Sequence, residues 1–232
     1  MPKPYYILSM LPTIDALGVP APLTSREFLD LFEPDDPLLA EVEALFLGDD
    51  LLLRQAAMAG RDCTGHTPAV LTRGQIAGEL ELPEPLILER TDDAMRFVAP
   101  EDALWEAYYQ WLADFAATRR SKFLRAWAAF EVGLRNALAA HRAAALDLDA
   151  GGYLIAESLG DDAGEYTAIL NDLHTGETPL EQKEILDLAR WAWLNEHDEW
   201  FTFGNDEILA YAARLLLTTR WERINDAADK AS

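Results

Sequence analysis

The chain has 232 residues, half of them hydrophobic, so it can bury a sizeable core as one large domain or two small ones. Its net charge of −22 repels phosphate backbones and anionic headgroups, so we expect neither nucleic-acid binding nor direct membrane insertion. The most apolar run, Ile208–Leu217, is too short to span a bilayer. The single cysteine, Cys63, excludes an internal disulfide, and the N-terminus lacks the pattern of a signal peptide. We therefore expect a cytoplasmic protein.

The first 100 residues predict short helices separated by loops. Tyr5–Leu11 is an apolar run that begins either a strand or a helix, because seven residues are too few for periodicity to decide. Residues 60–100 are the least regular part of the chain, with several Gly and Pro. The helices expected in this part are Arg26–Phe32 with Ser25 as its cap, a helix from Pro37 to Gly48 with Asp36 as its cap, a helix opened by Asp49 or Asp50 and ending at Met58, and a short one from Thr72 to Leu82.

After Pro100 the pattern becomes strongly helical, with apolar residues recurring every three or four positions. All seven tryptophans fall between Trp105 and Trp221, which places the main core there. The sequence therefore predicts an all-α helical bundle with long Ala-rich helices. We expect an irregular N-terminal region over residues 1–100 and a main helical body over residues 101–232. Further signals in this body are a Gly- and Asp-rich break at Asp147–Gly164, a short helix at Glu165–Leu173, a helix begun by Thr178 and Pro179, and a last helix capped by Asn205.

The charge reverses along the chain. Counting Lys and Arg against Asp and Glu gives −12 for residues 1–102, +3 for residues 103–146 and −13 for residues 147–232. Two interpretations are open: the acidic flanks fold back on the basic helix Lys122–Asp147, or the helix presents its cations to a partner. The candidate partner-docking residues lie within two helical turns and are Arg119, Arg120, Lys122 and Arg125.

Glu131 and Arg135 are four residues apart on the same predicted helix, where side chains meet on one face. An exposed pair there contributes only a few tenths of a kcal/mol, whereas a buried pair is costly unless both ions are fully paired. We expect a partly buried structural ion pair in preference to a contact with a partner.

No catalytic, cofactor-binding or metal site is predicted. The sequence has no phosphate-binding loop of the G-x-x-x-x-G-K-[ST] type and no nucleophile elbow. Asp147 and Asp149 begin like a calcium loop, but position twelve is Ser158, where a bidentate Glu is required. Cys63 and His66 lack further zinc ligands at paired spacing. The polar cluster Glu196–Glu199 is typical of a solvated helix end, with a hydrolytic or hard-metal site as the less favoured alternative.

Four segments of the chain carry a resemblance to known proteins, and they are YYILSMLP (Tyr5–Pro12), AWAAFEVGLRNALAAHRA (Ala126–Ala143), LDLARWAWL (Leu186–Leu194) and ILAYAARLLLTTRW (Ile208–Trp221). In this order they resemble a family of bacterial proteins encoded among the genes of V/A-type rotary ATPases. The segment after Phe130 is also similar to a helix of the C subunit of these machines, the eukaryotic d subunit. Glu131, Arg135, Asn136 and Arg142 fill comparable places there, with the order of Asn and Arg exchanged.

The resemblance implies a non-catalytic, all-helical subunit or assembly factor of a V/A-type ATP synthase/ATPase. Its partners would be the rotor shaft subunits and the proteolipid ring, so the protein would be peripheral to the inner membrane through its complex. The alternative from another class is a stand-alone acidic interaction or inhibitor protein that binds a cationic partner.

Overall fold

A computed structural model describes residues 4–63, 65–87, 97–160, 166–198 and 204–231. The fold is all-α, as predicted, and the described residues form no strand. Short 3-10 turns connect some of the helices: η1 (Glu84–Leu86), η3 (Ala150–Tyr153) and η4 (Glu157–Leu159). The α-helices are α1 (Pro4–Met10), α2 (Ser25–Leu29), α3 (Pro37–Met58), α4 (Arg73–Ala77), α5 (Pro100–Arg119), α6 (Lys122–Ala145), α7 (Thr167–Leu173), α8 (Pro179–His197) and α9 (Asn205–Ala231).

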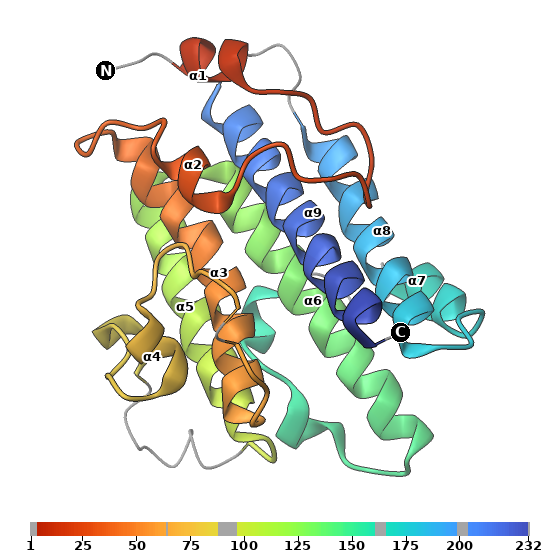
Figure 1. Ribbon diagram of the computed structural model, residues 1–232. Coiled ribbons are helices and arrows are strands. Elements are labelled where there is room, and N and C mark those ends of the chain that lie inside the picture. Colours follow the sequence, from red (N-terminus) through yellow and green to blue (C-terminus); the bar gives the residue numbers. More distant parts are fainter. Residues whose placement is uncertain (1–3, 64, 88–96, 161–165, 199–203, 232) are drawn as a thin grey trace.

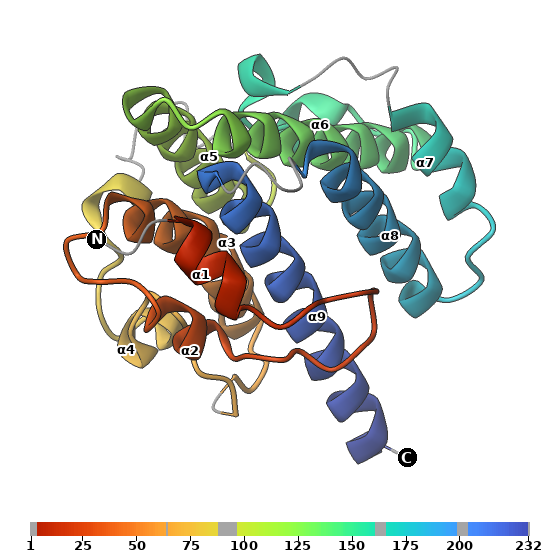
Figure 2. The same cartoon turned by 90° about the horizontal axis from the view of Figure 1, so that it is seen from above.

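The last helix, α9, lies at the centre of the bundle. It packs against α3, α6 and α8, and its first part also contacts α1. Figure 1 shows α3 and α5 on one side of it and α8 on the other, and Figure 2 shows the same arrangement from above. Helices from the first part and from the last part of the sequence therefore pack against the same central helix.

Capping residues begin several helices where the sequence predicts them. The Asp36 carboxylate accepts a hydrogen bond from the backbone of Leu38 at 2.9 Å, with Pro37 at the first helical position. Thr72 and Thr178 each form a reciprocal capping box with the residue three positions on. The cap of α2 is Thr24, one residue before the predicted Ser25. The ambiguous Tyr5–Leu11 run is helical, and α4 ends at Ala77, before the predicted Leu82.

The predicted break at Gly48 is wrong, because α3 continues through it. A Cβ atom at Gly48 would lie 2.7 Å from the Tyr108 hydroxyl, so glycine is required for the close approach of α5. The Tyr108 hydroxyl donates to the Ala44 carbonyl at 3.1 Å. Asp49 and Asp50 therefore lie inside a helix and do not begin one, and both are buried.

One hydrophobic cluster runs from Ile7 to Leu217. The core is larger than the expected Trp105–Trp221 region, since Phe28, Phe46 and Leu51 are fully buried in it. Residues before and after the expected boundary at residue 100 thus belong to the same hydrophobic core. No helix in the described part of the chain is long and apolar enough to cross a membrane.

Candidate functional site

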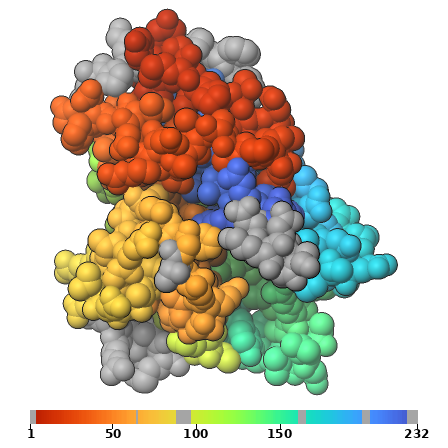
Figure 3. Space-filling model, in the orientation of Figure 1, coloured from red at the N-terminus to blue at the C-terminus, as the bar shows by residue number. Residues whose placement is uncertain are grey.

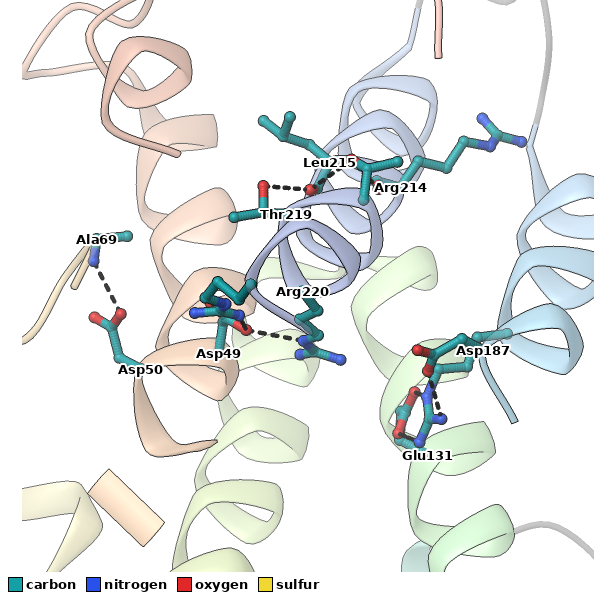
Figure 4. Close-up of polar contacts among 12 residues, drawn as sticks. Asp49, Asp50, Ala69, Glu131, Asp187, Arg214, Leu215, Thr219 and Arg220 are labelled. Atoms are coloured by element: carbon teal, nitrogen blue, oxygen red, sulfur yellow. Dashed lines mark hydrogen bonds and ion pairs between the residues drawn. The ribbon is translucent and has the colours of Figure 1, made fainter. Parts of the chain in front are cut away.

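Asp49 anchors an ion cluster between α3 and α9. One carboxylate oxygen accepts from Arg220 Nε at 2.8 Å and from Arg223 Nη2 at 2.6 Å, and the other accepts from Arg223 Nη2 at 2.9 Å (Figure 4). Burial alone would raise the pKa of this carboxyl, but attraction to the two guanidinium groups outweighs it and lowers the pKa. Asp49 therefore carries a negative charge inside the fold.

Asp50 holds the loop after α3 through backbone hydrogen bonds. Its carboxylate accepts from the amides of Ala69, Val70 and Leu71 at 2.9, 2.7 and 2.7 Å. Burial raises its pKa to about 6, although the three amide donors oppose the shift. The residue is 1% exposed, so this carboxyl fixes the loop rather than meeting solvent.

A second ion cluster connects α6 to α8. Arg190 donates to the two Glu131 oxygens from Nε at 2.6 Å and from Nη2 at 2.9 Å, which is a bidentate pair. It also donates from Nη1 to Asp187 at 3.2 Å, and Asp187 pairs with Lys183 as well. Figure 4 shows Glu131 and Asp187 facing each other across the space between the two helices.

The expected ion pair between Glu131 and Arg135 is not formed in the described part of the chain. Arg135 instead donates to Asp102 of α5 at 2.8 Å, and its guanidinium carbon lies 5.1 Å from the centre of the Trp105 ring. The physical reason is that α5 and α8 each bring an opposite charge to α6, so both residues pair between helices. Glu131 is 8% exposed, and its partner is Arg190 of α8.

These ion pairs surround a cavity of about 220 Å³ between α3, α5, α6, α8 and α9. Leucine and tryptophan side chains form much of its wall. Among the described residues lining it, the acidic one is Glu131 and the basic ones are Arg135, Lys183, Arg190 and Arg220. The Tyr109 hydroxyl group adds a further polar group to the lining.

The four candidate docking residues lie together at the corner where α5 passes into α6. Only Arg120 and Ser121 separate the two helices, and Arg120 adopts the left-handed conformation with φ of 57°. The side chains of Arg119, Arg120, Lys122 and Arg125 are all exposed. None of them forms an ion pair within the described residues, so the acidic flanks do not neutralise them by direct contact.

The cations of this corner interact favourably with the end of α5 and unfavourably with the start of α6. A helix C-terminus attracts cations, so Arg119 suits the end of α5. A helix N-terminus repels them, yet Lys122 and Arg125 occupy the first residues of α6, whose first turn contains no acidic residue. Beside the corner, Arg119 lies 5.3 Å from the centre of the partly exposed Phe115 ring, which stacks on Trp111. Arginine next to aromatic surface is typical of protein interfaces.

The other sequence candidates are engaged in local structure. Asp149 accepts from the Gly151 amide and caps η3. The Cys63 thiol donates to the Leu53 carbonyl at 3.5 Å. His197 stacks on Trp193, Asp198 pairs with Arg214, and Glu199 lies outside the described residues. Within those residues, no group of three or more His, Cys, Asp or Glu side chains is placed to hold a metal ion.

Sequence reasoning missed Asp49, Lys183, Asp187, Arg190 and Arg220 as members of interior ion clusters. A signal was present for Asp49, because two acids interrupt the apolar run LFLGDDLLL. Charges inside such a run are costly unless paired, which predicts a buried ionic contact. The partners themselves lie up to 174 residues away, so no local pattern identifies them.

Fold and site together define an all-helical protein with paired charges in its interior and, among the described residues, an unpaired basic corner on its surface. The family model described as a protein of unknown function (DUF2764) matches residues 82–230, and the chain belongs to this family. The match includes α5 to α8 and all but the last residue of α9. Neither a curated protein nor a solved structure matches the chain.

Proposed function

We propose that the protein is a non-catalytic subunit or assembly factor of a V/A-type ATP synthase/ATPase, with a role like that of the C subunit of these machines. In this role it links the central rotor shaft to the membrane ring, and the corner between α5 and α6 contacts a partner protein of the complex. The resemblance of the four segments is the reason for proposing this partner. The exposed basic corner is the surface proposed to contact it.

The observation that carries the proposal is the unpaired positive charge of the corner. In a chain of net charge −22, cations have many acidic groups with which to pair. Arg119, Arg120, Lys122 and Arg125 are instead exposed and make no ion pair with described residues. Lys122 and Arg125 also oppose the dipole of α6. Cations at a helix N-terminus lower the stability of the free protein, and such a cost is typical of a surface that binds a partner.

The test is co-purification from the native cell at low ionic strength, using the full chain as bait. We expect subunits of a V/A-type ATPase to be recovered. The double variant Arg120→Glu/Arg125→Glu should lose them, and association should weaken as salt is raised, because rim charges act mainly on association. The matched control is Arg61→Glu, which reverses an exposed cation in the loop after α3.

Circular dichroism must show that each variant remains folded. If folded wild-type protein recovers no ATPase subunit, the proposal fails, and recovery of a cationic partner would then favour the acidic interaction or inhibitor protein. If Arg61→Glu reduces recovery as much as the double variant, net charge and not the corner controls association.

A further inference from the structure

The cavity between α3, α5, α6, α8 and α9 contains donor groups that the fold does not use. Arg220 donates from Nε to Asp49, and its two terminal nitrogens make no hydrogen bond within the described residues. It lies between Asp49 on one side and Glu131 and Asp187 on the other (Figure 4). Arg135 likewise uses Nη2 for Asp102, which leaves its other nitrogens available.

Tyr109 provides a further unused donor. It is 6% exposed, and its hydroxyl group makes no hydrogen bond with any described residue. The hydroxyl oxygen is not among the sealed polar atoms of the described residues, so it is open to the cavity and available to donate to a bound molecule. Burial and the nearby Glu131 raise the pKa of this phenol, so the hydroxyl group remains a donor at neutral pH.

The acidic groups around the cavity hold the cations by other atoms. Asp49 binds Arg220, Asp102 binds Arg135, and Glu131 and Asp187 bind Arg190. These carboxylates hold the guanidinium groups in place. Among the described residues, no acidic side chain pairs with the two terminal nitrogens of Arg220. Preorganised donors of this kind bind an oxyanion without a cost for ordering the side chains.

The remaining wall is apolar. Leu45, Leu52 and Leu216 line it, together with the aromatic rings of Trp105 and Trp127. Figure 3 shows blue atoms of α9 between α3 (orange) and α8 (cyan), in agreement with the central place of α9. A mainly apolar pocket with a few convergent polar groups is typical of small-molecule sites.

We propose that this cavity binds a small organic anion, with its oxyanion head on Arg220, Tyr109 and Arg135 and its apolar body against the leucine and tryptophan wall. The site is independent of the proposed role in a rotary ATPase, because the basic corner is not part of the cavity lining. The cavity of about 220 Å³ limits the ligand to a small molecule.

The test is isothermal titration calorimetry of the full chain with phenyl phosphate, which has an oxyanion head and an apolar body. Inorganic phosphate provides the head alone, and benzyl alcohol provides the body alone. We expect saturable 1:1 binding of phenyl phosphate, with inorganic phosphate weaker and benzyl alcohol weaker still.

Two variants locate the site. Arg220→Met and Tyr109→Phe should each weaken phenyl phosphate binding by at least about tenfold, the effect of losing a hydrogen bond to a charged group. Tyr109→Phe is the cleaner variant, since its hydroxyl group contributes no hydrogen bond to the described fold, so its melting temperature should not fall. Arg125→Met, at the exposed corner, is the matched control and should bind as the wild type does.

Three outcomes would overturn the proposal. They are the absence of saturable binding, equal affinity for benzyl alcohol, and unchanged affinity in folded Tyr109→Phe. The second outcome would identify an apolar cavity without preference for anions, and the third would place any bound anion elsewhere.

Discussion

Asp49 and Asp50 are neighbours in α3, yet their surroundings shift their protonation in opposite directions. Successive helix residues point about 100° apart, so one carboxylate meets α9 and the other meets the loop at residues 69–71. Two guanidinium groups lower the pKa of Asp49, whereas burial raises the pKa of Asp50 to about 6. The same residue type therefore serves as a permanent counter-ion at one position and as a titrating group at the next.

We expect Asp49→Asn to lower the free energy of unfolding by about 3–5 kcal/mol, because it leaves Arg220 and Arg223 partly buried without their counter-ion. Urea unfolding measures the change. Asp30→Asn is the control, since Asp30 pairs with Arg26 on the surface and an exposed pair contributes only about 0–1 kcal/mol. Equal effects of the two substitutions would contradict the structural role of Asp49.

We expect the Asp50 carboxyl to titrate near pH 6 in the folded protein, against 3.8 as its ordinary value. The folded state then binds this proton more tightly than the unfolded state. The contribution of Asp50 to stability is therefore full below pH 3.8 and is lost as the pH rises through about 6. The side-chain ¹³C shift of Asp50 followed by NMR gives the midpoint, with Asp49 as the internal control that stays ionised over this range. A midpoint of 4 or below would contradict the prediction.

Among the helices, the starts of α3, α4 and α8 could be predicted from the sequence because a cap is a local pattern of side chain and backbone. The continuation of α3 through Gly48 could not, since the reason is Tyr108, sixty residues away. The same limit applies to the ion clusters. The i, i+4 spacing of Glu131 and Arg135 is correct, but their partners come from α8 and α5, and only the packing of those helices selects them.

The start of α6 gives a prediction in which stability and binding change in opposite directions. Lys122→Glu replaces a cation by an anion at a helix N-terminus, so we expect the protein to become more stable by about 0.3–1 kcal/mol. Association with the proposed partner should weaken. Thermal unfolding and the co-purification assay measure the two effects.

Arg119→Glu is the matched control, because it places an anion at the C-terminal end of α5. It should lower stability for the reason that Lys122→Glu raises it, and it also removes an attraction that opposes the raised pKa of Glu41. If Lys122→Glu destabilises the protein, the charge of Lys122 supports the fold and the corner needs no explanation through binding.

For the whole molecule, sequence periodicity predicted the all-α class because helical patterns are long after Pro100. The extent of the core was not predictable. The tryptophan positions predict a core over residues 105–221, but leucine and phenylalanine side chains of α2 and α3 belong to the same cluster. A core shared by both halves of the chain favours cooperative unfolding.

We therefore expect a single unfolding transition for the full chain. Tryptophan fluorescence reports on residues 105–221, which contain all seven tryptophans, whereas circular dichroism at 222 nm reports on every helix. The two curves should coincide in urea. Loss of helical signal at lower urea, before the fluorescence changes, would show that the N-terminal helices unfold separately and that residues 1–100 form a unit of their own.

The central position of α9 also affects folding of the chain during its synthesis. The N-terminal segment lies against this helix, with the Tyr211 hydroxyl donating to the Pro12 carbonyl at 2.9 Å and the Ala21 amide donating to Glu222 at 2.6 Å. A ribosome synthesises α9 after each of the helices against which it packs, at about 5–20 residues per second. The apolar faces of α1 and α3 thus emerge several seconds before the surface that covers them. We therefore expect these apolar faces to stay exposed, and open to chaperone binding, until α9 has left the ribosome and packs against them.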